Sequence, residues 1–276
     1  MRANRKSPLV GLVNAGPVGK ASIFRLGSIQ AHLGPVLGPN PRVGTRIVNQ
    51  LGAGQPAGGA ADLNRCDLIV ISARAARLPG ILAELDNASI RWTGKVVVLY
   101  DCGKDSRALR SLADQGASTA SIARLALDEP WFVVEGDRLA VRLSRRLLDE
   151  ARLPVIVVDP SAHPLLSAAG MLAGALSMPL LRASEACLRH AGVDAARGGS
   201  LALAMSREAL RAYRKAGRRA WTAALAASQE DSLAEVHKAL DSFDPRLEQF
   251  FRVVMGAARR LMAEETRAWA ANSTAS

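Results

Sequence analysis

Near its N-terminus the chain carries a short glycine-containing turn of the kind that binds phosphate groups. The segment N-A-G-P-V-G, residues 14–19, directly follows the apolar run Leu9–Val13. It matches the dinucleotide-binding pattern G-x-G-x-x-G, with Asn in place of the first glycine. After glycine, Asn is among the residues that best tolerate the positive φ angle of such a tight turn. The sequence therefore predicts a phosphate-binding turn between a first strand and a first helix.

Each position of this turn has a physical role in a phosphate site. Gly16 would let the backbone approach a pyrophosphate, and Gly19 would let the following helix pack closely on the strand. Pro17 suits the first turn of that helix, whose free N–H groups and partial positive charge attract phosphate. The candidate cofactor contacts in the turn are Asn14, Ala15, Gly16, Pro17, Val18 and Gly19. The alternative is a tight turn that packs a helix on a sheet and binds nothing.

Two arginines after the second apolar run, Leu33–Leu37, indicate which dinucleotide would bind. NAD-preferring folds usually place an acidic residue at the end of the second strand, where it holds the ribose hydroxyls. Here the run is followed by G-P-N-P-R, without an acid, and Arg42 and Arg46 lie one helical turn apart. Guanidinium groups pair well with a 2′-phosphate, which favours NADP, with NAD still possible. Asn40 and Arg42 are therefore candidate cofactor contacts, and the alternative is a surface helix that begins with arginine.

An alternation of strands and helices positions these residues. Compact apolar runs predict strands at Leu9–Val13, Leu33–Leu37, Asp67–Ile71, Lys95–Leu99, Trp131–Val134 and Pro154–Val158. Helical patterns lie between them, at residues 17–30, 42–51, 75–86, 105–115 and 138–152. This order is typical of βαβ units and a doubly wound, mostly parallel α/β sheet of the Rossmann type. Ser72 and Ala73 follow the third run and are further candidate cofactor contacts, because such sheets bind ligands at the carboxyl ends of their strands.

The second half of the chain has a different pattern. From Ser161 onward we find helical periodicity and no strand pattern, so we expect a dinucleotide-binding domain over 1–159 and a helical domain over 160–276. The stretch Pro164–Leu181 is uncharged and nearly long enough to span a bilayer. Its serines, prolines and many small residues favour a buried interface helix instead. We therefore expect a homodimer assembled through the helical half and no membrane span.

Composition narrows the class of protein. The chain has 276 residues, of which 49% are hydrophobic, so it can bury a sizeable core. Its three cysteines form no disulfide framework, and no export signal follows the basic start, which favours the cytoplasm. The net charge of +11 is spread over both halves. A basic stripe, Arg207 to Arg218, is either a solvated helix face or a surface for an anionic partner, with nucleic acid as the weakest hypothesis.

Taken in order, the motifs resemble a known superfamily. They are N-A-G-P-V-G, G-P-V-L-G-P-N-P-R-V-G-T-R-I, D-L-I-V-I-S, G-K-V-V-V and W-F-V-V-E-G-D, followed by a helical half. Over residues 8–262 the chain resembles the Rossmann-like proteins of the 6-phosphogluconate dehydrogenase and pyrroline-carboxylate reductase superfamily. The branch with an uncharacterised helical C-terminal domain is the most similar. The resemblance implies a nicotinamide-binding domain, a helical dimerisation domain and a substrate cleft between them.

The chain departs from this superfamily at the polar positions that orient a substrate. Where the superfamily carries His-x-Ser-Gly, this chain has Tyr100–Gly103, and where it carries Ser-x-His-Pro, this chain has Ser121–Arg124. Leu166–Ser167 replaces its Tyr-His pair, and Ala175 replaces its Asn. The Lys and Asn pair of the related hydroxyacid dehydrogenases is absent as well. The sequence therefore gives no catalytic residue, and its four scattered histidines predict no metal site.

Two functions from different classes remain open. The first is an NADP-dependent oxidoreductase acting on a small carbonyl, imine or hydroxy compound. The second is a non-catalytic dinucleotide-binding sensor or dimeric scaffold that has lost the chemistry. Asp101, Cys102 and Lys104, after the fourth strand, and His163, near the domain boundary, are weaker ligand candidates by position alone. Ordinary loop and surface roles are the alternative for all four.

Overall fold

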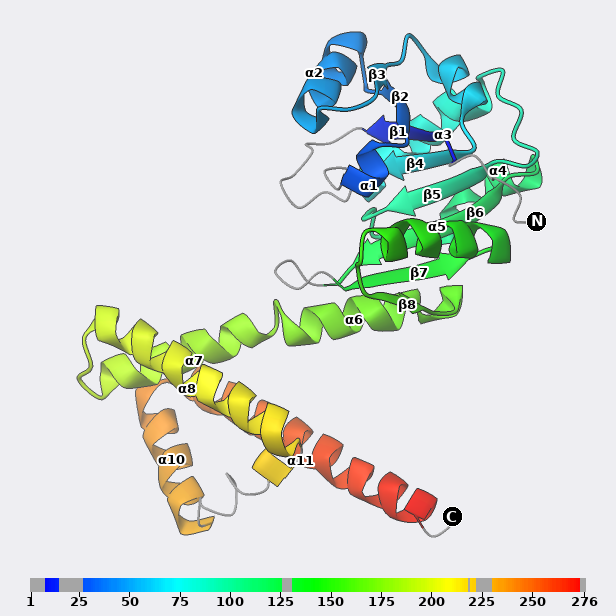
Figure 1. The fold of residues 1–276 in the computed structure, drawn as a ribbon. Coiled ribbons are helices and arrows are strands. Elements are labelled where there is room, and N and C mark those ends of the chain that lie inside the picture. Colours follow the sequence, from blue (N-terminus) through cyan, green and yellow to red (C-terminus); the bar gives the residue numbers. More distant parts are fainter. Residues whose placement is uncertain (1–7, 15–26, 126–130, 218, 222–229, 274–276) are drawn as a thin grey trace. The chain divides into compact units, whose positions relative to one another are not determined.

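The structure is a computed structural model, and it describes residues 8–14, 27–125, 131–217, 219–221 and 230–273 (Figure 1). The strands are β1 Val10–Asn14, β2 Leu33–Leu37, β3 Gln55–Pro56, β4 Leu68–Ser72, β5 Val96–Tyr100, β6 Ser118–Arg124, β7 Phe132–Gly136 and β8 Val155–Val157. The helices around them are α1 Gly27–Gln30, α2 Pro41–Leu51, α3 Leu78–Asp86, α4 Arg110–Asp114 and α5 Arg138–Glu150. Every strand and helix predicted within the described part of the first half is present, with ends shifted by a few residues.

The eight strands form one sheet in the order β3-β2-β1-β4-β5-β6-β7-β8. All neighbouring strands are parallel except β6 and β7, which pair in antiparallel fashion. The first six strands therefore have the order of a Rossmann fold. The prediction of a doubly wound, mostly parallel sheet is confirmed. Beyond β6 the sheet continues with two more strands, β7, which is antiparallel to β6, and β8, which is parallel to β7.

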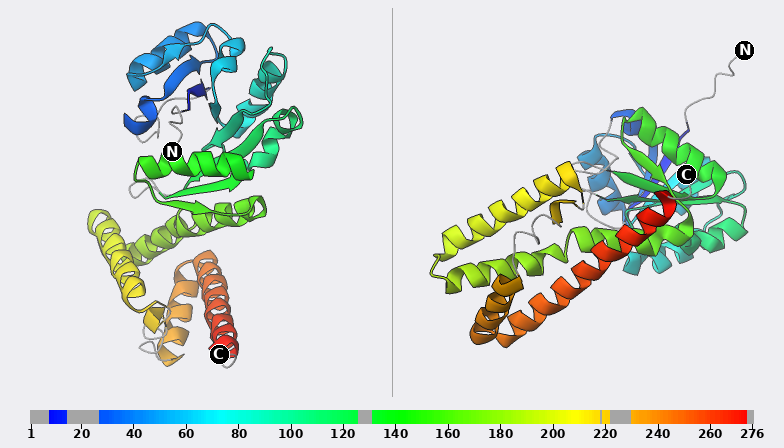
Figure 2. Two further views of the ribbon diagram at one scale, coloured as in Figure 1. Left: turned by 45° about the vertical axis from the view of Figure 1, so that its right-hand side comes forward. Right: turned by 90° about the horizontal axis from the view of Figure 1, so that it is seen from below.

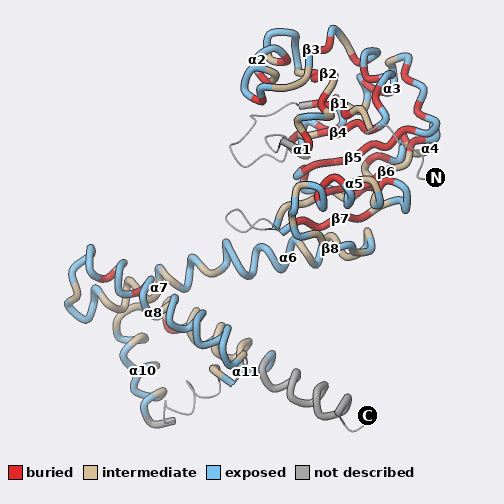
Figure 3. Tube along the Cα trace, viewed as in Figure 1, coloured by how far each residue is buried: buried red, intermediate tan, exposed pale blue. Residues whose placement is uncertain are grey.

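The sheet is covered on both faces, as its strands require. Residues of β4 and β5 are buried almost without exception, because helices lie on either side of them (Figure 3). One face contributes a core cluster that includes Leu12, Val98 and Phe132 and packs against α2 and α5. The other contributes a cluster with Ile69 and Leu99 that packs against α3 and α4. This explains why the strand sequences are apolar throughout rather than alternating.

The sequence did not predict β3 or β6. The strand β6 reads S-T-A-S-I-A-R, in which small polar residues take buried positions. Their polar groups have partners: the Thr119 amide donates to Asp137 Oδ2 at 2.6 Å, and the Ser121 hydroxyl donates to the Lys104 carbonyl at 3.0 Å. Such satisfied polar groups can be buried at low cost, and they remove the apolar signal on which strand prediction depends.

The second half is helical throughout its described residues, as predicted. Its helices are α6 His163–Ala173, α7 Ser177–His190, α8 Ala195–Ala216, α10 Glu230–Phe243 and α11 Pro245–Ser273 (Figure 2). Contacts divide the chain into two units, Met1–Gly170 and Met171–Ser276, whereas the change from strands to helices falls earlier, after β8. In the second unit α7 packs against α8, and α10 packs against α11.

The apolar stretch around α6 and α7 is not one continuous helix. A turn at residues 174–176 separates the two helices, and neither has a buried residue within this chain. By length and composition alone, the segment Pro160–His190 could cross a membrane, with a mean hydropathy of 1.6 in its most apolar window. Across the second unit, the buried residues among those whose side chains are described are Gly198, Ala202 and Glu248.

Candidate functional site

The carboxyl ends of β1, β2 and β4 meet at the point where the sheet changes direction. The chain runs outward from β1 to β3 and then returns to β4 on the other side of β1. Asn14, the last residue of β1, is aligned with Ser72 at the end of β4, and Val13 is aligned with Leu37 at the end of β2. In open α/β sheets this point is where ligands bind. The structure therefore brings the predicted contacts Asn14, Ser72 and the adjoining Ala73 to one edge.

The rest of the glycine turn, Ala15, Gly16, Pro17, Val18 and Gly19, lies outside the described residues. The strand that precedes it ends at Asn14, as the motif requires. The role of these five residues in binding pyrophosphate stays a prediction.

The helix α2 begins at the carboxyl end of β2 and is fixed there by a cap and a close contact. The Asn40 side chain caps it by accepting a hydrogen bond from the Val43 amide at 3.0 Å, and Pro41 occupies its first turn. Gly38 lies against Gly44 so closely that a Cβ atom at Gly38 would be 2.5 Å from the Gly44 nitrogen. Asn40 thus has a structural role at this edge, in addition to its predicted one.

Two arginines extend from this helix into solvent. Arg42 and Arg46 are exposed and four residues apart on α2, and its first turn contains no acidic residue. Neither forms an ion pair with the residues that the structure describes. Both guanidinium groups are therefore available to an anion at the carboxyl edge of β2.

An open pocket lies beside these strand ends. It encloses about 880 Å³ of empty space, open to solvent, and is lined by Val13, Leu37, Gly38, Pro39, Ala76, Arg77, Gly80, Ile81 and Glu84. One wall is formed by the ends of β1 and β2, and the other by α3 with the 3-10 helix Ala75–Arg77 before it. The sequence did not point to the residues of the α3 wall, although the helix closely follows Ser72 and Ala73. Their position after β4 is the signal that could have identified them.

The predicted candidates after β5 form a second, tightly bonded group. Asp101 adopts a left-handed conformation with φ of 51°, and its amide donates to the Ile122 carbonyl at 2.8 Å. Its carboxylate lies 3.7 Å from the Arg124 guanidinium at the end of β6. Cys102 is buried, and this burial raises the pKa of its thiol, so it is neutral at ordinary pH. Neutrality argues against Cys102 as a nucleophile.

A buried carboxylate that the sequence did not single out organises the same loop. Glu135 of β7 is 2% exposed and accepts hydrogen bonds from the Ser106 amide at 2.7 Å and the Ser106 hydroxyl at 2.6 Å. Next to it, a hydrogen bond from Arg107 lowers the pKa of Asp105, with a smaller favourable contribution from the charge of His163. The Nε2 atom of His163 is buried without a hydrogen-bond partner among the described residues. Glu135 therefore anchors the loop, whereas His163 is an unsatisfied polar group beside it.

The positions that depart from the resemblance have no obvious substitute. Ser121–Arg124 lie in β6, and Leu166 and Ser167 lie in α6. The described residues contain no group of three His, Cys, Asp or Glu side chains that could hold a metal ion. Among the described residues, Glu84 in the pocket wall is the one general acid or base that lines the pocket.

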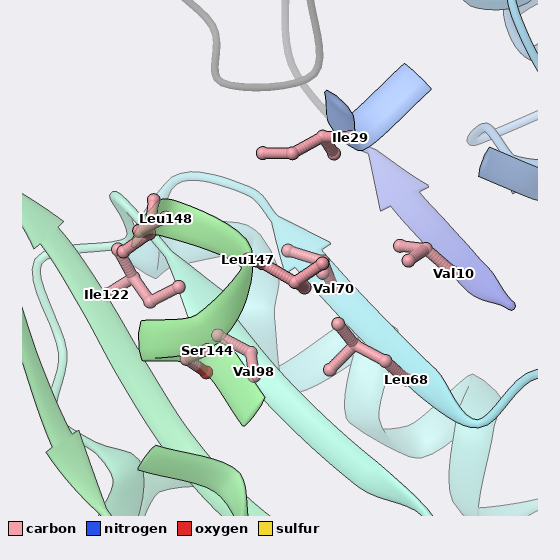
Figure 4. A pocket seen from close by; sticks show the side chains of 9 residues that line it. All are labelled: Val10, Ile29, Leu68, Val70, Val98, Ile122, Ser144, Leu147 and Leu148. Carbon is pink, nitrogen blue, oxygen red and sulfur yellow. The ribbon is translucent and has the colours of Figure 1, made fainter. Parts of the chain in front are cut away.

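A further cavity, small and apolar, lies inside the first unit, between the sheet and α5 (Figure 4). Its lining consists of Val10, Ile29, Leu68, Val70, Val98, Ile122, Ser144, Leu147 and Leu148. The Ser144 hydroxyl is buried there without a hydrogen-bond partner in the described part of the chain. A small apolar cavity with a single hydroxyl lacks the polar groups that would bind a polar ligand, so we interpret it as a gap in core packing rather than a binding site.

Comparison with known proteins supports the fold. No protein-family model matches the sequence, and no curated protein matches it. An imine reductase from Pseudomonas sp. superposes with a TM-score of 0.60 at 22% identity, covering 87% of each chain. The pyrroline carboxylate reductase of Plasmodium falciparum, solved with NADP bound, has a TM-score of 0.60 at 12% identity and covers 93% of this chain and 96% of its own.

A third similar structure is an imine reductase variant from Myxococcus stipitatus in complex with NAD+. Its TM-score is 0.61 at 17% identity, and the alignment covers 95% of this chain and 94% of that one. At these identities the similarity establishes architecture, and it extends through both halves of the chain. The chain therefore has the Rossmann-type fold of these imine and pyrroline-carboxylate reductases, with a mostly parallel sheet followed by a helical half.

Proposed function

We propose that the protein is an NADP-dependent oxidoreductase that acts on a small carbonyl, imine or hydroxy compound. The observation that carries the proposal is the open pocket at the carboxyl ends of β1 and β2. The helix α2 begins two residues after the lining residue Pro39, and its first turn has arginine and no acid. Similar structures hold NADP or NAD+, and the same fold serves reductases of C=N bonds. These similarities favour the reductase class without fixing the substrate.

The residues present fit a dinucleotide. Gly38 keeps α2 within van der Waals distance of the strand end, because any side chain there would collide with the helix backbone. Arg42 and Arg46 are exposed on α2 and would bind the 2′-phosphate, and Arg77 is a cation in the pocket wall. When bound, the nicotinamide would supply or accept a hydride. The protein's part at this edge is to hold the phosphates and orient the ring.

The test is a fluorescence titration with NADPH and NADH. Exposed charge pairs contribute about 0.2–1 kcal/mol each, so we expect NADPH to be preferred by roughly tenfold or less. Arg42→Ala combined with Arg46→Ala should abolish the preference and leave NADH binding intact. The matched control is Arg65→Ala with Arg91→Ala, which removes the same charge before β4 and β5, at the opposite edge of the sheet. A wild type that prefers NADH would refute the phosphate assignment.

A non-catalytic dinucleotide-binding sensor or scaffold is the second candidate. It is favoured by Leu166, Ser167 and Ala175, which stand where the superfamily carries polar groups. Turnover of NADPH with a panel of small carbonyl compounds and imines distinguishes the two. Tight binding without turnover of any member would support the sensor.

We also propose that the protein is a soluble, cytoplasmic homodimer that assembles through its helical half. Large apolar side chains are exposed along α6, α7 and α8, among them Leu172, Met178 and Leu210 at 66%, 64% and 69%. Apolar surface on this scale is normally covered by a partner. The turn at residues 174–176 interrupts the apolar segment, which favours a protein interface over a bilayer span. No membrane and no nucleic acid is needed to explain this surface.

A further inference from the structure

The second unit contains a pocket of its own, between α10 and α11. The two helices meet at Asp244 and diverge from it, as Figure 1 shows. The space between them holds about 830 Å³, open to solvent, and is lined by Leu233, Ala234, His237, Arg252, Met255, Gly256 and Arg259. All of these residues belong to the second unit, so the pocket is separate from the strand ends that form the candidate dinucleotide site.

A buried carboxylate fixes the polar side of this pocket. Glu248, in the first turn of α11, is 6% exposed and lies behind the pocket lining. Its Oε1 atom accepts hydrogen bonds from Arg252 Nε at 2.9 Å and Arg252 Nη2 at 2.6 Å, and lies 2.8 Å from His237 Nδ1. These hydrogen bonds, first from Arg252 and then from His237, lower the pKa of Glu248, so the group stays ionised.

An ionised Glu248 determines which nitrogen of His237 carries a hydrogen. A carboxylate can only accept, so Nδ1 of the imidazole must donate to it. The other nitrogen, Nε2, is then left for a ligand, as an acceptor in the neutral ring and as a donor in the protonated one. Phe251 contacts the ring edge-on, with a centroid separation of 5.4 Å, and further restricts its orientation. Glu248 is therefore a positioning residue for His237.

The remaining lining combines positive charge with an apolar wall. Arg252 and Arg259 lie two turns apart on α11, and the described side chains of the lining include no acid. Arg252 is paired with Glu248, whereas Arg259 forms no ion pair with any described residue. Leu233 and Met255 supply apolar surface. One guanidinium without an ion pair among the described side chains, one oriented imidazole and an apolar wall complement a monoanion that has an apolar body.

We propose that this pocket binds the carboxylate of a small organic acid, with Arg259 and His237 contacting the carboxylate and Leu233 and Met255 the apolar part. A carboxylate fits the single guanidinium that has no ion pair among the described side chains better than a dianion does, because one positive charge balances one negative charge. The site is independent of dinucleotide binding and would stand if the proposed oxidoreductase activity were disproved. A purely structural role for the Glu248 cluster, as a clamp between α10 and α11, predicts no ligand at all.

The experiment uses the full-length protein and benzoate as the probe, with benzamide as its uncharged counterpart. Binding is followed by calorimetry and by the His237 ring signals in NMR spectra, assigned with the variant His237→Gln. We expect benzoate to bind with a Kd below about 10 mM and to shift the His237 signals. Benzamide should neither bind nor shift these signals.

Two variants test the location. Arg259→Gln removes the unpaired cation, and we expect benzoate affinity to fall at least about tenfold, as for the loss of a charged hydrogen bond. Gly256→Leu fills the pocket: a Cβ atom at Gly256 would meet nothing within 4 Å except Arg260 Nη1 at 3.8 Å. This change also improves helix propensity, so the variant should fold and still lose binding.

The matched control is Arg246→Gln, which removes the same charge from the first turn of α11, away from the pocket. Its benzoate affinity should remain within about twofold of the wild type. Thermal melts of all variants confirm folding. The proposal is overturned if benzoate fails to bind, if benzamide binds equally well, or if Gly256→Leu binds benzoate as the wild type does.

Discussion

The contact between Gly38 and α2 offers a direct test of how the dinucleotide edge is built. In Gly38→Ala the new Cβ atom would lie 2.5 Å from the Gly44 nitrogen and 3.0 Å from its Cα. The first distance is about 1 Å short of ordinary contact, and both atoms belong to backbone that cannot rotate away. The N-terminal turn of α2 must therefore move outward, carrying Arg42 with it.

Overpacking of this kind costs about 1–3 kcal/mol. For a unit of this size, each kcal/mol corresponds to about 2–4 °C in Tm, so we expect Gly38→Ala to melt roughly 2–12 °C below the wild type. NADPH affinity should fall as well, because the pocket wall and the arginines shift together. Circular dichroism melts and the NADPH titration measure the two effects.

Gly80→Ala is the matched control for this substitution. Gly80 lines the same pocket, but a Cβ atom there meets nothing within 4 Å. Because alanine is the better helix former, this variant should melt at or slightly above the wild-type temperature. If Gly38→Ala melts within about 1 °C of Gly80→Ala, the close approach of α2 to β2 is not a real constraint on the fold.

Two further predictions concern buried groups in the sheet half. Ser144→Ala should raise Tm by about 2–4 °C, since it removes a buried hydroxyl that has no hydrogen-bond partner among the described residues. Ser111→Ala, at an exposed position of α4, should change Tm less, and equal effects of the two substitutions would contradict an unsatisfied Ser144 hydroxyl. Burial raises the pKa of Cys66 from 9.0 to about 11. The unfolded thiol therefore ionises first as the pH rises, and the free energy of unfolding should decline between pH 9 and 11. Urea titrations should show a shallower decline in Cys66→Ala, and identical slopes would refute the assignment.

The sequence predicted the sheet well because its signals were local. Runs such as Leu68–Ser72 and Val96–Tyr100 are apolar at every position, and a strand buried on both faces needs no other signal. The strand β6 was missed because Thr119 and Ser121 are buried through hydrogen bonds to Asp137 and Lys104, which are distant in sequence. Such partners become visible only when the fold brings them together.

The candidate site was predictable in part for a similar reason. Asn14, Ser72 and Arg42 follow strands or open a helix, so topology alone places them at one edge. The α3 wall of the pocket, including Arg77 and Glu84, depends on how a helix lies over the sheet, which no local pattern specifies. The Glu248 cluster of the second unit is of the same kind, because its partner His237 comes from another helix.

The distribution of buried residues leads to a last prediction, which concerns cooperativity. Among the residues whose side chains are described, the buried hydrophobic ones belong almost entirely to the first unit, and Ala202 is the one in the second unit. We therefore predict that the sheet half is stable alone, whereas the helical half is stabilised by the proposed partner subunit. Calorimetry should resolve two transitions, of which the one that unfolds the helical half depends on protein concentration.

The magnitude of that dependence follows from mass action. A tenfold increase in concentration adds about 1.4 kcal/mol to the stability of a dimer, or a few degrees in the Tm of the helical half, and leaves the sheet half unchanged. Ala173→Arg would place a charge in the proposed interface and should lower the helical transition selectively, because an unpaired charge is costly to bury. Ala239→Arg, at an exposed position of α10 outside the proposed interface, tests whether the effect belongs to that interface or to any added charge. A single, concentration-independent transition in the wild type would show that the helical half is stable without a partner.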